Sequence, residues 1–224
     1  MTQPLRLIVF DVDGTLVDSQ KDIVASMTAA FEAADLPVPA RADILSIVGL
    51  SLDVAVARLV PDLPQALYAA MVETYKQTYH QRRASLGAQV SSPLYPGIST
   101  LLNQLQGVPE YLLGIATGKS RRGLDALLAG HGLDRMFLTQ QVADHHPSKP
   151  HPAMLLAAMS ETGVSPENAV MIGDTEFDMQ MADAAGMRSI GVSWGYHSAD
   201  RLDAADLLVH EVADLANTIK TLWE

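Results

Sequence analysis

Hydrophobic positions follow two different spacings along this chain, and the change of spacing divides it. Residues 7–10 form a short continuous apolar run that leads directly into Asp11, which predicts a buried strand over residues 5–10. From Ser19 to Arg83 the apolar positions recur every three or four residues, and no convincing strand interrupts them. We therefore expect one strand followed directly by an all-helical segment, with helices over residues 19–35, 44–48, 52–61 and 67–83.

From residue 94 onward, apolar strand patterns alternate with helical ones. Strands are expected over residues 111–116, 136–139, 169–172, 188–192 and 207–209, each separated from the next by a helical pattern or a turn. Repeated strand–helix units predict a parallel sheet covered on both faces. The expected fold class is α/β: a doubly wound parallel-sheet (Rossmann-like) core, residues 1–17 and 86–224, with an inserted all-helical domain, residues 18–85.

Composition and charge restrict the classes of partner. Apolar residues make up 48% of the 224 residues and charged residues 18%, which is typical of a soluble globular protein. The net charge of -11 argues against non-specific nucleic-acid binding. Cysteine is absent, so thiolate metal sites and cysteine nucleophiles are excluded. Without a signal-peptide pattern or a long apolar run, we expect a cytoplasmic protein with no membrane partner. Monomer and homodimer both remain open.

Polar side chains follow the ends of three expected strands. Asp11 and Asp13 follow the first strand, Thr117 and Gly118 follow the second, and Asp174 and Asp178 follow strand 169–172. Lys149 lies between prolines just before a helical pattern. Because the carboxyl ends of parallel strands meet at one edge of a sheet, we expect these groups to lie together.

Two clusters of carboxylates without histidine or cysteine suit a hard cation, and Mg²⁺ fits best because it commonly shares a phosphate ligand. A lysine and a threonine hydroxyl can hold the remaining phosphate oxygens. An aspartate can act as a nucleophile, and a second carboxylate two residues later can protonate the leaving alcohol. The pattern therefore indicates phosphoryl transfer from a small phosphorylated metabolite.

These residues also resemble a known family. Asp11-Val-Asp13-Gly14-Thr15, Thr117, Lys149-Pro150 and Gly173-Asp174 occur in the order of the four motifs of the haloacid dehalogenase-like superfamily. The helical insert resembles the α-helical cap of one of its subclasses, and within the superfamily the chain looks most like the phosphoglycolate phosphatase group. The resemblance implies an Mg²⁺-dependent phosphatase, with 2-phosphoglycolate as the best single substrate.

The resemblance assigns a role to each acidic residue. It implies that Asp11 is the nucleophile and a metal ligand, and that Asp13 is the general acid and base and binds the metal through its backbone carbonyl. Asp174 would also bind the metal. Asp178 would bind it through water or orient Lys149. Asp13 favours ester or anhydride hydrolysis, since the branches that cleave halides or phosphonates lack an acid at this position.

The resemblance also assigns the phosphoryl group to Thr117, Gly118 and Lys149, although members of the family often carry asparagine where this chain has Gly118. Ser19 is expected to cap the first helix of the insert. A carboxylate on the leaving group would need a cation, for which Arg58 is a weak candidate.

Other activities share the same motifs and remain open: a pyrophosphatase, a nucleotidase and a sugar-phosphate mutase of the superfamily. A hypothesis from a different class of function is a catalytically silent binding or regulatory protein on the same fold. That reading predicts loss of a motif residue such as Asp11 or Lys149, and neither is lost.

Overall fold

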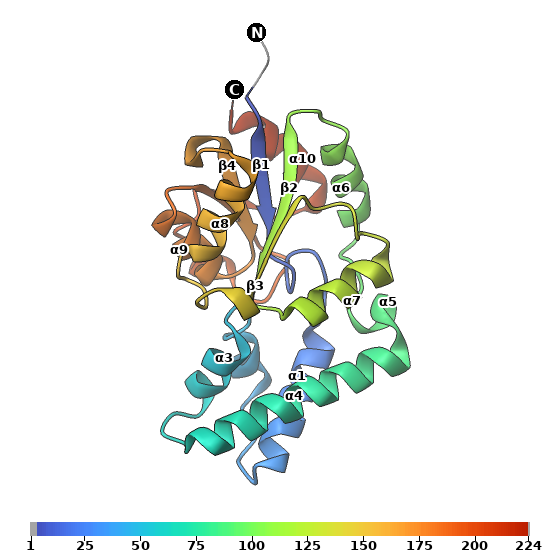
Figure 1. Cartoon of the computed structure of the whole chain (residues 1–224), viewed down its shortest axis with the longest axis vertical. Coiled ribbons are helices and arrows are strands. Elements are labelled where there is room, and N and C mark those ends of the chain that lie inside the picture. The colour runs from blue at the N-terminus through green and yellow to red at the C-terminus, as the bar shows by residue number, and fades with distance from the viewer. Residues whose placement is uncertain (1–3, 224) are drawn as a thin grey trace.

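The computed structural model describes residues 4–223, and its centre is a six-stranded parallel sheet (Figure 1). The strand order is β3-β2-β1-β4-β5-β6, the doubly wound order expected from the sequence. The strands are β1 (Arg6–Phe10), β2 (Tyr111–Thr117), β3 (Thr139–Val142), β4 (Ala169–Gly173), β5 (Arg188–Val192) and β6 (Leu207–Val209). The order reverses at β1, so the crevice where such sheets bind ligands opens at the carboxyl ends of β1 and its neighbours.

The third strand lies later in the chain than the sequence pattern predicted. We expected residues 136–139, but β3 begins at Thr139, which pairs with Gly114 of β2. Of the apolar residues before it, Met136 and Phe137 pack into the core, whereas Leu138 is 66% exposed. The strand itself is largely polar, and its buried polar side chains Thr139 and Gln141 hydrogen-bond each other.

Helices cover both faces of the sheet (Figure 1), and the side chains of β1 alternate between the two faces. Ile8 and Phe10 pack with α6 (Ile98–Gln106), α7 (Arg121–His131) and α10 (Val212–Thr221). Leu7 and Val9 pack with α8 (Ala153–Thr162) and α9 (Glu176–Ala184). Short 3-10 helices lie at Ala143–His145, Pro166–Asn168 and Ala199–Leu202. Both faces of the sheet are therefore buried, and only the ends of the strands are left accessible to a ligand.

Four helices form a separate apolar cluster beyond the carboxyl ends of the strands (Figure 1). They are α1 (Gln20–Ala33), α2 (Arg41–Leu45), α3 (Leu52–Leu59) and α4 (Gln65–Leu86). The two connections to the sheet lie side by side, since Asp18 N donates to Pro93 O at 2.9 Å. The four-residue helix α5 (Ala88–Ser91) follows and was not expected, because it is too short to show a periodic pattern. None of the helices within residues 4–223 is long and apolar enough to cross a membrane.

Phe31 tests how much the cluster of the four helices depends on a single side chain. It is 2% exposed and packs among α1, α2, α3 and α4 residues. Phe31→Ala should lower the free energy of unfolding by about 3–5 kcal/mol, since it leaves a cavity in a packed core. Leu86→Ala, at a position that is 45% exposed, is the control and should change it by less than about 0.5 kcal/mol. Urea unfolding followed by circular dichroism measures both, and equal values would contradict the packing described.

Candidate active site

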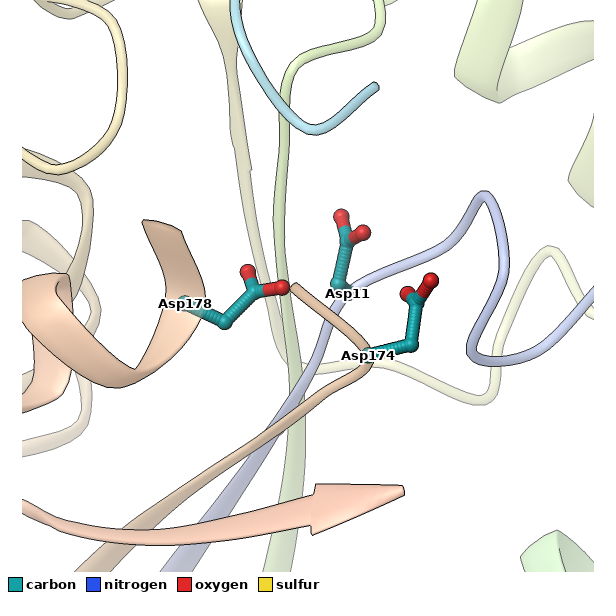
Figure 2. Close-up of side chains that lie close together, drawn as sticks. All are labelled: Asp11, Asp174 and Asp178. Carbon is teal, nitrogen blue, oxygen red and sulfur yellow. The ribbon is translucent and has the colours of Figure 1, made fainter. Parts of the chain in front are cut away.

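Three buried carboxylates meet at the ends of β1 and β4. Asp11 follows β1 and Asp174 follows the adjacent β4, while Asp178 lies in the first turn of α9. One carboxylate oxygen of each lies within 4.8 Å of the others (Figure 2). Figure 2 shows the Asp11 carboxylate extending beyond the end of β1, with the other two on either side. The structure thus brings together the acidic residues that the sequence placed at two separate strand ends.

Lys149 lies among these carboxylates and forms ion pairs with two of them. Its Nζ is 2.8 Å from Asp11 Oδ1 and 2.7 Å from Asp178 Oδ1, and its side chain is completely buried. Burial alone would lower the pKa of Lys149, but the charges of Asp11 and Asp178 outweigh it and hold the pKa above its usual value. The lysine therefore stays charged.

Asp178 has its hydrogen-bonding capacity taken up within the protein. Beside Lys149, it accepts from Thr175 N at 3.1 Å and from Thr175 Oγ1 at 2.7 Å, both at Oδ2. Thr175 and Asp178 form the capping box that begins α9. Of the two roles that the resemblance implied for Asp178, this geometry favours orienting Lys149.

Asp174 is held from both sides. Its Oδ1 accepts from Thr15 Oγ1 at 2.8 Å and its Oδ2 accepts from Tyr196 N at 2.8 Å. Gly14 makes this approach possible: its φ of +91° favours glycine, and a Cβ there would lie 2.1 Å from Asp174 Oδ2. The glycine of the first motif is thus required by the aspartate of the last.

The carboxylates carry the electrostatic signature of a cation site. Burial raises the pKa of Asp11 to about 7, although Lys149 opposes the shift. Burial, with the charges of Asp11 and Asp178, also raises the pKa of Asp174 well above its usual value. Asp11 Oδ2 is buried and has no hydrogen-bond partner among the described residues. An all-oxygen donor set with an unpaired buried oxygen fits a divalent cation, whose charge would favour the ionised carboxylates.

Asp13 is held by two residues whose contact with it the sequence did not predict. Lys119 Nζ donates to both carboxylate oxygens at 2.7 Å, and Ser19 Oγ donates to Oδ1. Ser19 was expected to cap a helix, but its side chain makes no capping hydrogen bond to α1 and instead bonds Asp13 and Tyr196 OH. That expectation is wrong because the acidic partner, six residues earlier, competes for the hydroxyl.

Lys119 follows the phosphoryl-binding candidates at the end of β2. Its Nζ also donates to Tyr79 OH of α4 at 3.2 Å and lies 5.0 Å from the centroid of that ring. Burial would lower the pKa of Lys119, but Asp13 and Tyr79 outweigh it and raise the pKa. The only signal in the sequence was its position two residues after Thr117, at a strand end that was already suspected.

A cavity of about 410 Å³ joins this site to the helical segment. Asp11, Asp13, Thr117, Gly118 and Lys119 line it on the side of the sheet. From the helical segment it is lined by residues of α1, α3 and α4 and by the loop 47–51. The cavity thus reaches Asp11 and Asp13, with the helical segment as its other wall.

The loop 49–51 closes against the sheet. Ser51 N donates to Ser148 Oγ at 2.8 Å, beside the active-site lysine. Arg58, the weak candidate for an anionic leaving group, is not among the cavity's lining residues; its guanidinium lies over the ring of Phe177, 5.3 Å from the centroid.

Comparison with known proteins identifies the family. Residues 8–192 match the family of haloacid dehalogenase-like hydrolases. "Probable phosphatase IndB" of Dickeya dadantii is 36% identical over 89% of this chain and 86% of its own length. A phosphoglycolate phosphatase of Pasteurella multocida is 31% identical over 88% of this chain and 89% of its own length. A haloacid dehalogenase-like family hydrolase from Streptococcus pneumoniae, 27% identical, superposes with a TM-score of 0.81 over 96% of this chain and 98% of its own.

The fold and the site define a hydrolase with an all-carboxylate centre at the edge of a doubly wound sheet. The chain belongs to the haloacid dehalogenase-like hydrolase family. It is an enzyme of the phosphoric monoester hydrolase class, as the sequence predicted.

Gly118 generates a test of the contact between the loop 49–51 and the sheet. A Cβ at this position would lie 2.6 Å from Leu50 O and 2.7 Å from Gly49 O. Gly118→Asn should therefore displace the loop and lower the free energy of unfolding by about 1–3 kcal/mol, measured by thermal denaturation. Gly118→Ala carries the same Cβ without the amide and should show most of this loss. Unchanged stability of both variants would mean that the loop does not rest on the glycine.

Proposed function

We propose that this chain is an Mg²⁺-dependent phosphatase that hydrolyses a small phosphate monoester through an aspartyl-phosphate on Asp11. The best single substrate is 2-phosphoglycolate, which a relative's name supports. The observation that carries the proposal is the Asp11 carboxylate: Oδ1 is paired with Lys149, while the buried Oδ2 has no partner among the described residues. A nucleophile needs such a free lone pair, and Asp11 lines the cavity where a substrate would lie.

In the first step, Asp11 attacks phosphorus and the bond to the leaving alcohol breaks. Asp13, two residues along the chain, gives its proton to the departing oxygen. A water molecule then attacks the aspartyl-phosphate, Asp13 takes up its proton, and the bond between Asp11 and phosphorus breaks. The covalent intermediate on Asp11 splits a single displacement into two easier ones, and Asp13 serves as the acid in the first and as the base in the second.

The remaining site residues hold the phosphoryl group. Thr117, buried at the end of β2, and the Gly118 amide would donate to its oxygens. Lys149 has one donor left after its contacts with Asp11 and Asp178, and it would neutralise a third phosphoryl oxygen. These fixed donors stabilise charge that develops during transfer and need no reorganisation.

We assign the metal to Asp11, Asp174 and the backbone carbonyl of Asp13, with Asp178 supporting it through Lys149. When bound, Mg²⁺ neutralises phosphoryl charge as it develops. We also propose that residues 18–85 act as a cap domain over a core of residues 1–17 and 86–224, excluding water from the cavity. A cytoplasmic location and a monomeric or dimeric state stay predictions from the sequence.

Asp11→Asn tests the nucleophile. Turnover of 2-phosphoglycolate should fall by about 10³-fold or more, because an amide cannot form the phosphoenzyme. Phosphate release with Mg²⁺ measures this, and Asp214→Asn, an exposed position on α10, is the charge-matched control. Retention of more than a few per cent of the activity in Asp11→Asn would overturn the mechanism. Pyrophosphate, nucleotides and sugar phosphates assayed alongside identify the alternatives, and conversion of a sugar phosphate without release of phosphate indicates a mutase.

Stabilisation by Mg²⁺ should depend on pH. The pKa of Asp11 is raised from 3.8 to about 7 in the folded protein, so ionisation of Asp11 disfavours folding. The contribution of Asp11 to the free energy of unfolding is therefore fully present below pH 3.8 and is lost as the pH rises through about 7. Mg²⁺ requires the ionised carboxylate and offsets this loss. The rise in Tm on adding MgCl₂ should be small near about pH 5 and large near about pH 8. Asp11→Asn should show a smaller rise at each pH; equal rises for the native chain at both pH values would contradict the assignment.

A further inference from the structure

Lys119 lies where a leaving group would have to pass. In the proposed mechanism, Asp13 gives its proton to the leaving oxygen, so that oxygen must come within hydrogen-bond distance of the Asp13 carboxyl. Lys119 Nζ contacts both oxygens of that carboxyl at 2.7 Å. The lysine is therefore within about 5–6 Å of the leaving oxygen, which is two hydrogen-bond lengths. Groups attached to that oxygen would lie in the cavity that Lys119 lines, within reach of the lysine.

The contacts of Lys119 cannot all persist when a substrate binds. An ammonium has three donors, and here they go to the two oxygens of Asp13 and to Tyr79 OH. Asp13 needs one of these oxygens for the leaving group. One donor of Lys119 then loses its acceptor, and a buried cation without an acceptor is costly. A leaving group with an anionic oxygen supplies a new acceptor, whereas an alkyl group does not.

Two other buried cations near the cavity are already engaged elsewhere. Lys149 is fully buried between Asp11 and Asp178, on the side of the phosphoryl group. Arg83 donates to the backbone oxygen of Gly123 at 3.0 Å. Lys119 is also fixed in place, since its backbone N donates to Thr117 Oγ1 and its backbone O accepts from Ala143 N. A fixed cation beside the general acid distinguishes one leaving group from another.

We propose that Lys119 is a specificity-determining residue that binds an anionic oxygen of the leaving group. This inference rests on the proposed phosphatase function and deepens it. It defines the preferred substrates as small phosphate monoesters whose leaving group carries a negative charge, such as a carboxylate, close to the ester oxygen. The hydrogen bond to Tyr79 OH, on the side of the helical segment, holds Lys119 in place while Asp13 bonds the leaving oxygen.

The test compares 2-phosphoglycolate with ethyl phosphate, which has the same number of carbons but no carboxylate. The native enzyme should prefer 2-phosphoglycolate in kcat/KM. Lys119→Met should reduce this preference by about 10–100-fold, the loss expected for one hydrogen bond to a charged group. Lys119→Arg keeps the charge and should retain more of the preference than Lys119→Gln. Thermal denaturation shows which of the variants are folded.

Lys76→Met is the matched control, because Lys76 lines the same cavity but is exposed and lies on α4. It should change the preference by less than about threefold. A shift as large as that of Lys119→Met would assign the effect to the overall field of the cavity and overturn the proposal. Equal losses for both substrates in Lys119→Met would also overturn it, because the lysine would then act only by holding Asp13.

Binding separates this inference from the proposed function. In an Asp11→Asn background, calorimetry with the same two compounds should show that Lys119→Met weakens 2-phosphoglycolate by about 10–100-fold and ethyl phosphate by much less. If the native enzyme hydrolyses neither compound, the proposed function fails, and the binding experiment still judges Lys119. Equal weakening of the two compounds overturns the inference.

Discussion

The ion pairs of Lys149 with Asp11 and Asp178 are the interaction on which the rest of the site depends. Adjacent parallel strands end at the same edge of the sheet, and here one oxygen of each of three buried carboxylates lies within 4.8 Å of the others. Without a buried cation, such carboxylates would repel one another and shift toward their neutral forms. The ammonium removes part of this repulsion and leaves one oxygen of Asp11 unpaired. The sheet edge can therefore be both acidic and folded.

A second lysine repeats this arrangement closer to the helical segment. Lys119 pairs with Asp13 as Lys149 pairs with Asp11, but its surroundings differ, because Lys119 lines the cavity and contacts Tyr79 of α4. Lys149 is enclosed by the core, whereas Asp13 and Lys119 face the cavity that a substrate would enter. In the mechanism that we propose, Lys149 serves the reaction and Lys119 selects the leaving group, and Lys119 also contacts Tyr79 of the helical segment.

Strand ends were the most predictable part of the molecule. Asp11, Thr117 and Asp174 lie at the ends of apolar strands, so the rule that parallel strands end at the same edge of a sheet was sufficient to place them together. β3 was misplaced because its strand residues are polar, while Met136 and Phe137 before it pack into the core. The role of Ser19 was predicted wrongly because Asp13, six residues earlier, takes its hydroxyl. Lys119 was missed because its role comes from a contact with Asp13, and no spacing in the chain reports a contact across 106 residues.

Asp178 unites two properties that proteins usually keep apart. The same carboxylate begins α9 through the capping box with Thr175 and holds the lysine that pairs with Asp11. A change at this residue therefore alters both the start of α9 and the surroundings of the lysine that pairs with Asp11. The start of α9 is thus coupled, through Lys149, to the Asp11 carboxylate at the end of β1.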